Sequence, residues 1–333
     1  MRDVAARAGV SLKTVSRAVN GEPNVSAAVQ ARVAAAVAEL GFERNDLARS
    51  LRHGRSSATL GLLIEDVTNP FYAAIAHEIE QVAAEKGYLL ITSSSQQQEE
   101  RERELVAALT RRRVDGLLLV LGGGDHGFVA EAARTTPTVF LDRPPVGIAA
   151  DAVLLDNRGG MHQAIEHLLE QGHRRIAFVS DPGELFTAAE RLRGYREALT
   201  AAGLEIDDAL VRLGRHDLGE AERIVEALLA LPAGERPTAI VTGNNRHSVA
   251  AARALARVPN PVALVGFDDI ELAELLARPL TVVAYDAGAL GRHGAELIFS
   301  RLGATPAEQP PPREIVVPTR LIARGSGELG PSS

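Results

Sequence analysis

Short, almost unbroken apolar runs that alternate with helical stretches constrain the fold of this chain more than any other feature of its sequence. Nine such runs follow one another from Thr59 onward: LGLLIE, YLLIT, GLLLVL, TVFL, AVLL, RIAFVS, TAIVT, VALVGF and TVVA. Helical patterns at residues 73–87, 160–172 and 246–258 lie between them. Strands that helices cover on both faces are apolar along their whole length, so we predict parallel strands. In a chain of 333 residues they predict an α/β core of two doubly wound parallel-sheet lobes.

The N-terminal segment has a different, purely helical pattern. Residues 3–8 predict a short helix that Gly9 interrupts, and Ser11 is placed to cap a second helix that ends near Asn20. Ser26 is placed to cap a third, longer helix. Two short helices joined by a glycine-containing turn and followed by a longer helix predict an all-α helix-turn-helix head.

The predicted second helix has two different faces. At about 100° per residue, an arc of about 140° contains Leu12, Lys13, Ser16, Arg17 and Asn20. The opposite side contains Thr14, Val15, Ala18 and Val19. Hydroxyl, amide and cationic groups contact base edges and phosphates in a major groove, and Arg17 suits a bidentate guanine contact. The pattern therefore predicts DNA binding, with a solvated polar face on a small helical domain as the alternative.

Charge is distributed unevenly along the chain. Residues 1–57 contain nine basic and five acidic side chains, so this segment carries +4 while the whole chain carries −7. A basic head on an acidic body predicts a polyanionic partner for the head. The chain has no cysteine, and no apolar run approaches the ~20 residues that span a bilayer. With no export signal evident, we expect a cytoplasmic protein with no membrane partner.

The segment at residues 45–57 joins the basic head to the acidic body. Its sequence is compatible with a helix but offers little apolar surface. Leu51 lies between Arg49 and Arg52, an arrangement that suits a wedge in a DNA minor groove with the cations on neighbouring phosphates. An interdomain linker whose leucine packs locally is the simpler alternative.

Polar residues follow almost every predicted strand of the core. They are Asp66 and Asn69, Ser93 to Ser95, Gly122 to Gly124, Asp142, Asp156, Ser180 and Asp181, Asn244 and Asn245, and Asp268. Ligands of open α/β sheets bind outside the carboxyl ends of the strands. Carboxylate and amide oxygens there, with the Arg191 guanidinium nearby, suit a neutral polyhydroxylated ligand. The alternative is that these residues serve turns and helix caps.

Nine stretches of the chain together carry a family resemblance. They are VSLKTVSRAVNG, NDLARSLR, GLLIEDVTNPFYAAIAHEIE, RRRVDGLLL, FLDRP, DNRGG, HLLEQGHRRIAFVS, RLRGYREAL and LVGFDDIELAELL. In this order and at this spacing the chain resembles the lactose-repressor (LacI/GalR) family of transcriptional regulators. The resemblance implies a helix-turn-helix DNA-binding domain at residues 1–44, a hinge helix or linker at 45–57 and a periplasmic-binding-protein-like core at 58–325.

The core is expected to divide into an N-lobe and a C-lobe. We expect the N-lobe at about residues 58–157 and 285–312, and the C-lobe at about 158–284 and 313–325. Residues 326–333 are predicted to form a disordered tail, without the leucine heptads of a coiled-coil extension.

The pattern and the resemblance together predict a set of residues that contact DNA. They are Ser11, Leu12, Lys13, Thr14, Ser16, Arg17, Asn20, Asn45, Ala48 and Leu51. By resemblance, Leu12, Lys13 and Arg17 read bases, while Thr14 and Ser16 position the helix. The last three residues of the set are implied to belong to a hinge helix that folds on DNA and opens the central base step.

In the core the resemblance implies an effector-binding cleft. With the strand-end pattern, it predicts the effector-binding residues Phe71, Tyr72, Asp142, Arg191, His216, Asn244, Asn245, Arg246 and Asp268. Arg191 is implied to clamp the ligand and Asp268 to accept hydrogen bonds from it. Relatives usually have Asn-Asp where this chain has Asn244 and Asn245, so a charge is removed there, and Arg246 adds a positive one. This exchange leads to the hypothesis of an acidic or phosphorylated sugar as effector.

These observations predict a homodimeric, ligand-responsive transcriptional repressor and no enzymatic activity. Two heads are expected to bind the half-sites of a pseudo-palindromic double-stranded operator, under control of a sugar or related metabolite. A sugar-binding receptor is one alternative, but it has no need of a basic helical head. An α/β enzyme acting on sugar phosphates is another, but the sequence has no HExxH pair, Gly-Lys-Ser/Thr loop or nucleophile elbow. We therefore expect no cofactor and no metal.

Overall fold

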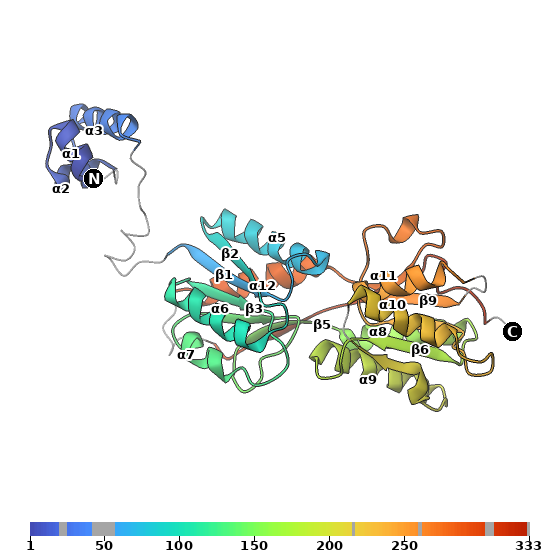
Figure 1. Ribbon diagram of the computed structural model, residues 1–333. Helices are drawn as coiled ribbons and strands as arrows, with labels where there is room; N and C mark the ends of the chain where they lie inside the picture. Colours follow the sequence, from blue (N-terminus) through green and yellow to red (C-terminus); the bar gives the residue numbers. More distant parts are fainter. Residues whose placement is uncertain (20–24, 42–56, 215–216, 259–261, 304–309, 332–333) are drawn as a thin grey trace. The chain divides into compact units, whose positions relative to one another are not determined.

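The computed structural model describes residues 1–19, 25–41, 57–214, 217–258, 262–303 and 310–331 (Figure 1). By its internal contacts the chain divides into two units, Met1–Ser57 and Ala58–Ser333. The second unit begins where the α/β pattern of the sequence begins.

The first unit contains the three predicted helices, α1 (Arg2–Ala8), α2 (Leu12–Val19) and α3 (Ala27–Glu39). Gly9 ends α1 with a φ of 64°, a left-handed conformation that glycine adopts without steric cost. One buried side chain from each helix, Val4, Val15 and Val33, meets the others in a small apolar core. The prediction of an all-α helix-turn-helix head is therefore confirmed.

The N-lobe of the second unit is built on a six-stranded sheet with the strand order β11-β5-β4-β3-β1-β2. The strands are β1 (Thr59–Ile64), β2 (Leu89–Ser94), β3 (Gly116–Leu119), β4 (Thr138–Leu141), β5 (Asp151–Leu155) and β11 (Glu314–Val317), all paired in parallel. Helices α5 (Pro70–Glu85) and α12 (Ala287–Arg301) cover one face. Helices α6 (Glu99–Arg111) and α7 (Ala130–Ala133), with the short η1 (Gly127–Val129), cover the other.

The C-lobe repeats this architecture with the strand order β12-β10-β9-β8-β6-β7. Its strands are β6 (Ile176–Ser180), β7 (Val211–Leu213), β8 (Ala239–Thr242), β9 (Ala263–Phe267), β10 (Thr281–Ala284) and β12 (Arg320–Ile322). Helices α8 (Asn157–Glu170) and α9 (Phe186–Ala201) cover one face, and α10 (Leu218–Leu229) and α11 (Asn245–Leu255) the other. The short helices η2 (Asp208–Leu210) and η3 (Ala273–Leu275) lie in connections of this lobe.

The chain passes between the two lobes three times: from β5 to α8, from β10 to α12 and from β11 to β12 (Figure 1). All nine predicted strands are confirmed. Within the described residues three further strands occur, β7, β11 and β12, and β12 pairs antiparallel with β10. Assigning residues 313–317 to the C-lobe was wrong, because β11 pairs with β5 in the N-lobe before the last crossing.

The C-terminal segment is packed onto the C-lobe. The Ser326 side chain is buried, accepts a hydrogen bond from the Thr281 backbone N–H at 2.8 Å and donates one to the Leu264 carbonyl at 2.5 Å. Glu328 lies 2.6 Å from Nε2 of His167. The prediction of a disordered tail is therefore wrong for residues 326–331, because residues distant in sequence form hydrogen bonds with the polar groups of this segment.

A buried ion pair fixes α12 against the sheet of the N-lobe. Nη2 of Arg301, in the last turn of the helix, donates to Oδ1 of Asp151 at 2.6 Å. The side chain of Asp151 has no exposure and that of Arg301 has 7%. Oδ1 of Asp151 also accepts from the Arg313 backbone N–H at 2.7 Å, so the pair joins β5, α12 and the segment before β11.

Candidate functional site

Helix α2 begins with the side-chain cap that the sequence predicts. The backbone N–H of Thr14 donates to Oγ of Ser11 at 3.1 Å, and the two hydroxyl oxygens lie 2.8 Å apart. The cap fixes the first turn of the helix, which carries the adjacent residues Leu12 and Lys13.

The two faces of α2 are as predicted. Val15 is fully buried in the head, and the partly buried Ala18 and Val19 pack against the same apolar cluster. Lys13 and Arg17 are exposed, and Leu12 is 47% exposed although it is apolar. Ser16 is partly buried at the edge of this surface. An exposed leucine on the same face as two cationic groups is a suitable surface for a major groove, where thymine methyl groups offer apolar contacts.

Four residues of the predicted DNA-contact set lie outside the described residues: Asn20, Asn45, Ala48 and Leu51. The hinge helix therefore stays a prediction.

In the second unit, two aspartates occupy equivalent positions in the two lobes. Asp142 follows β4 and Asp268 follows β9, and these strands hold the same place in the two sheet orders. Both have positive φ values, 66° and 73°, in the left-handed region that aspartate adopts more readily than most residues. Both side chains are buried. Each lobe therefore delivers one buried carboxylate at the carboxyl end of its sheet.

Asp268 organises the start of α11 and one of the crossings between the lobes. Its Oδ2 accepts from the Asn245 backbone N–H at 2.9 Å, and its Oδ1 accepts from the Tyr285 hydroxyl at 2.5 Å. Burial and the neighbouring Asp268 raise the pKa of Tyr285 well above its usual value, so the phenol stays a hydrogen-bond donor. Tyr285 lies between β10 and α12, so this carboxylate links a lobe to a crossing.

Arg191 is held in a buried position by three kinds of contact. Its Nε donates to Oδ1 of Asn157 at 2.8 Å, and its Nη1 donates to the Gly243 carbonyl. The guanidinium carbon lies 3.8 Å from the ring centre of Phe267, in a cation–π arrangement. Asn157 begins α8 and Gly243 follows β8, so the plane of this guanidinium is fixed by the fold.

Glu65 and Arg143 form a buried ion pair that the sequence analysis did not identify. Nη2 of Arg143 donates to Oε2 of Glu65 at 2.6 Å, and the Tyr72 hydroxyl donates to the same oxygen at 3.1 Å. Nη1 of Arg143 donates to the Leu121 carbonyl at 3.1 Å. Both charged side chains are 7% exposed. The one available signal was position, because Glu65 ends one predicted strand and Arg143 lies two residues after another.

The carboxyl group of Asp142 lies beside this ion pair. Its Oδ2 is 3.5 Å from Nε of Arg143. Burial raises the pKa of Asp142 to about 6, although the positive charges of Arg143 and Arg191 oppose the rise and Asp268 adds to it. The buried Asp142 therefore loses its proton only near neutral pH.

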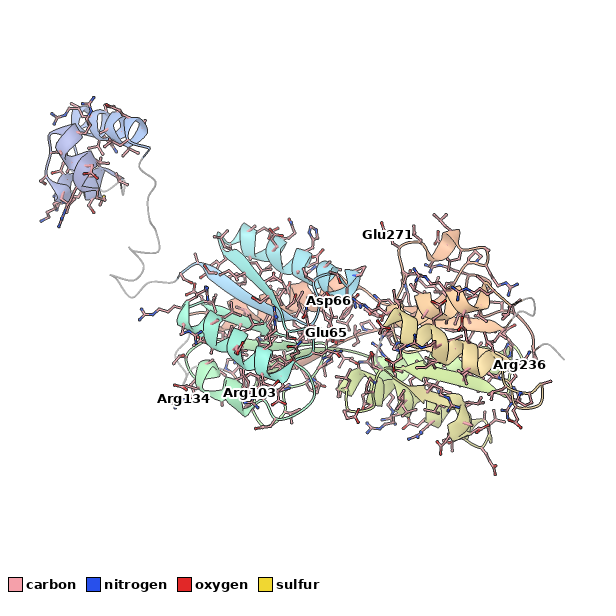
Figure 2. All side chains as sticks on the ribbon, in the orientation of Figure 1. Glu65, Asp66, Arg103, Arg134, Arg236 and Glu271 are labelled. Carbon is pink, nitrogen blue, oxygen red and sulfur yellow. The ribbon has the colours of Figure 1, made fainter. Side chains whose placement is uncertain are left out.

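Side-chain hydrogen bonds cross from the N-lobe to the C-lobe. Nδ2 of Asn245 donates to Oδ1 of Asn69 at 2.8 Å. Nη2 of Arg246 donates to Oδ2 of Asp66, which Figure 2 labels where the N-lobe faces the C-lobe. Within the C-lobe, Nδ2 of Asn244 donates to Asp181 at 2.6 Å. The helix starts of α5 and α11 are thus joined by side chains.

The structure brings eight of the nine predicted effector residues around one cavity of about 40 Å³. They are Phe71, Tyr72, Asp142, Arg191, Asn244, Asn245, Arg246 and Asp268. Glu65, Asn69, Arg143, Asp181, Thr187 and Tyr285 complete the lining. His216 lies outside the described residues. Oδ1 of Asn245 is buried and has no hydrogen-bond partner within the described part of the chain, so this cavity offers an acceptor for a ligand hydroxyl.

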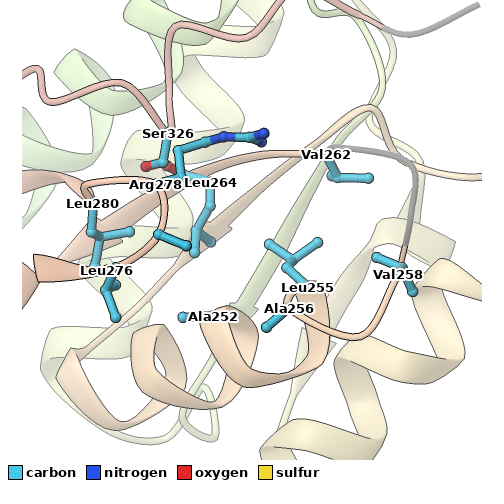
Figure 3. Close-up of a pocket in the computed structure, with 11 residues that line it drawn as sticks. Ala252, Leu255, Ala256, Val258, Val262, Leu264, Leu276, Arg278, Leu280 and Ser326 are labelled. Atoms are coloured by element: carbon cyan, nitrogen blue, oxygen red, sulfur yellow. The ribbon is translucent and has the colours of Figure 1, made fainter.

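A larger cavity of about 460 Å³ lies at the other end of the C-lobe sheet, near the start of β9 (Figure 3). Its lining is apolar except for Arg278 and Ser326. It has no cluster of carboxylates or amides to recognise a polar ligand, so the smaller polar cavity is the better candidate site despite its size.

The described residues form neither a membrane-spanning helix nor a cluster of metal-ligating side chains. None of the helices there combines the length and apolar character needed to cross a membrane. No group of three or more histidine, cysteine, aspartate or glutamate side chains in the same part of the chain is placed to hold a metal ion.

Comparison with known proteins gives matches to both units. Residues 1–45 match "Bacterial regulatory proteins, lacI family", and residues 165–327 match "Periplasmic binding protein-like domain". The chain is 34% identical over 332 residues to the ribose operon repressor of Escherichia coli strain K12, a match that covers 98% of this chain and 99% of that protein.

Two solved structures are similar over nearly the whole chain. The lac repressor dimer bound to operator and the anti-inducer ONPF matches with a TM-score of 0.83 at 27% identity, over 98% of each chain. The complex of the regulator CelR with cellobiose matches with a TM-score of 0.72 at 33% identity, over 97% of this chain and 98% of that one. The chain therefore belongs to the lacI family of bacterial regulatory proteins and is a transcriptional regulator, not an enzyme.

Proposed function

We propose that this regulator is a repressor that binds a pseudo-palindromic operator as a homodimer and responds to a small neutral sugar or related polyhydroxylated molecule. The observation that carries the proposal is the buried polar cavity, to which both lobes contribute carboxylates and amides, while the aromatic rings come from α5 and from Tyr285. Carboxylate and amide oxygens accept hydrogen bonds from hydroxyl groups, and the fixed guanidinium of Arg191 donates to ring or hydroxyl oxygens.

The charges around the cavity favour a neutral effector over an anionic one. Five carboxylates lie in or beside the lining, against three guanidinium groups: Glu65, Asp66, Asp142, Asp181 and Asp268 against Arg143, Arg191 and Arg246. Two of these cations already have carboxylate partners, Arg143 with Glu65 and Arg246 with Asp66. Because these two cations are already neutralised by carboxylates, they give no reason to expect an acidic or phosphorylated sugar. Ribose and cellobiose, which occur in the names of a relative and of a related complex, are neutral sugars.

The head supports sequence-specific DNA binding through α2. We assign base contacts to Leu12, Lys13 and Arg17, which are exposed, and helix positioning to Ser11, Thr14 and Ser16. Two heads bound to two half-sites match a two-fold operator. Effector binding in the core is expected to change operator affinity roughly 5–150-fold, a coupling of about 1–3 kcal/mol.

Exposed apolar side chains support association of two copies. Leu89 and Ile91 on the edge strand β2 are exposed, as are Leu272 and Leu275 at η3, the last of them 80%. A second copy would cover apolar area that a monomer leaves in water. We expect the protein to act in the cytoplasm, where bacterial operator DNA is found.

Two assays test the proposal. In the first, binding to a library of inverted-repeat duplexes is compared with binding to scrambled duplexes at moderate salt, and a clear preference for one repeat is expected. In the second, calorimetry compares neutral sugars with uronic acids and sugar phosphates, and a neutral sugar is expected to bind most tightly. The absence of any preference among duplexes would contradict operator binding. Tighter binding of a phosphate or acid would contradict a neutral effector.

A further inference from the structure

We propose that Asp66 and Arg246 form a latch that holds the two lobes of the core closed and regulates access to the cleft. The latch joins the loop after β1 in the N-lobe to the first turn of α11 in the C-lobe. The idea that it regulates effector binding rests on the proposed function of the cleft. The latch itself is a property of the core with no effector present.

The position of Arg246 on its helix explains why the pair favours closure. Arg246 is the second residue of α11, where the helix dipole is positive and a cation is unfavourable. Asp66 supplies the compensating negative charge from the other lobe. Separating the lobes would leave the guanidinium at the positive end of its helix without this partner.

The carboxylate of Asp66 is oriented before it meets the guanidinium. Its Oδ1 accepts from the Thr68 backbone N–H at 2.9 Å, and the Thr68 hydroxyl lies 2.8 Å and 2.9 Å from the two oxygens. Burial tends to raise the pKa of Asp66, but the bonds from Thr68 and the charge of Arg246 outweigh it and lower the pKa. The pair is therefore charged at every pH at which the effector is expected to act.

A neutral contact reinforces the ion pair. Oδ1 of Asn69 caps α5 by accepting from the Phe71 backbone N–H at 3.1 Å, and it also accepts from Nδ2 of Asn245 at 2.8 Å. The segment that leads from β1 into α5 is thus joined to the first turn of α11 by two adjacent contacts. The partners of the ion pair are 26% and 30% exposed, so salt is expected to screen it in part.

At the opposite rim of the cleft the two lobes meet through close packing. A Cβ atom added to Gly123, after β3, would lie 2.8 Å from the backbone carbonyl oxygen of Glu184, before α9. Phe186, the first residue of α9, packs against the apolar cluster of the N-lobe. Any side chain at position 123 is therefore expected to hold the lobes apart.

The size of the cavity makes the latch relevant to binding. About 40 Å³ is room for a few water molecules and not for a sugar ring. An effector as large as a sugar ring reaches Asp142 and Arg191 only when the lobes separate. This separation breaks the contact between Asp66 and Arg246. The strength of the latch therefore sets the population of the open form that can admit the effector.

The experiment measures the separation of the lobes with no effector present. Because the chain has no cysteine, the pair Glu104→Cys and Arg223→Cys, at exposed positions on α6 and α10, takes two spin labels cleanly. Pulsed electron–electron double resonance then gives the distribution of distances between the two spin labels, one on each lobe. Arg246→Gln and Asp66→Asn are each expected to increase the longer-distance population about two- to fivefold, the effect of losing a partly exposed ion pair. The charge swap Asp66→Arg with Arg246→Asp is expected to restore much of the short-distance population.

Two further variants make the result decisive. Arg257→Gln removes an arginine whose partners Glu222 and Glu226 lie in the same lobe, so it is expected to leave the distances unchanged. Gly123→Ala, which leaves Asp66 and Arg246 unaltered, is expected to lengthen the distances, which shows that the labels detect opening. If Gly123→Ala changes the distances while Arg246→Gln and Asp66→Asn do not, the latch is refuted and the proposed function is untouched. If the latch variants open the core but no sugar binds by calorimetry, the latch stands and the proposed effector fails.

Discussion

Replacing Asp142 by asparagine tests whether the cleft holds a charge that costs the folded protein stability. The carboxyl group is 4% exposed, and burial raises its pKa from 3.8 to about 6. The folded state therefore keeps a proton that the unfolded state releases between these two values. The free energy of unfolding consequently falls as pH rises through this interval and becomes level again above it.

The magnitude follows from the two pKa values. Each pH unit between them corresponds to 1.36 kcal/mol, so the full penalty above pH 7 is about 3 kcal/mol. At pH 5 the same relation gives about half of this penalty. Asparagine has nearly the same shape, accepts the left-handed backbone at this position and carries no charge. Asp142→Asn is therefore expected to stabilise the core by about 3 kcal/mol at pH 7.5 and by about half as much at pH 5.

Guanidinium unfolding followed by circular dichroism, at one protein concentration and at both pH values, measures this difference. Glu131→Gln, which removes an exposed charge from the same lobe, is the control and is expected to have little effect. The same variant should bind the effector more weakly, since Asp142 is proposed to accept hydrogen bonds from it. Equal stabilisation at the two pH values, or destabilisation at pH 7.5, would refute the reasoning.

Three other substitutions test separate parts of the chain. Arg17→Ala is expected to weaken binding to the selected operator by about 1–3 kcal/mol in gel-shift titrations, whereas an equal loss on random duplex would argue against base reading. Arg191→Ala should remove effector binding in calorimetry while operator affinity is retained, and unchanged effector affinity would exclude this residue from the site. Arg301→Met leaves the buried carboxylate of Asp151 without its cation and should cost about 3–5 kcal/mol in chemical unfolding, so a loss below about 1 kcal/mol would contradict a structural role for the pair.

The strands that the sequence predicted differ physically from those it missed. The nine predicted strands are apolar runs, and most of their residues are buried, so composition alone indicates them. β7, β11 and β12 have three or four residues each and are largely exposed or half-buried. Their stability comes from pairing with a neighbour strand, and that pairing is not visible in the local sequence.

The candidate site likewise contains residues that the sequence predicted and residues that it did not. The residues that follow strands, such as Asp142 and Asp268, were found because parallel strands place their carboxyl ends at one edge of a sheet. The partner of each charge was not found. Glu65 and Arg143 are 78 positions apart, and Asp66 and Arg246 are 180 apart.

The sequence by itself determined the helical head with its two-faced α2, the α/β core and the membership of a regulatory family, because local periodicity and motif spacing carry that information. The tertiary structure alone decided that Arg246 is neutralised across the cleft, that Asp142 is buried beside an ion pair, and that the C-terminal segment packs on the C-lobe. These outcomes depend on which distant side chains meet in a region of low dielectric. Burial and charge pairing are properties of the folded arrangement, and no stretch of the chain encodes them locally.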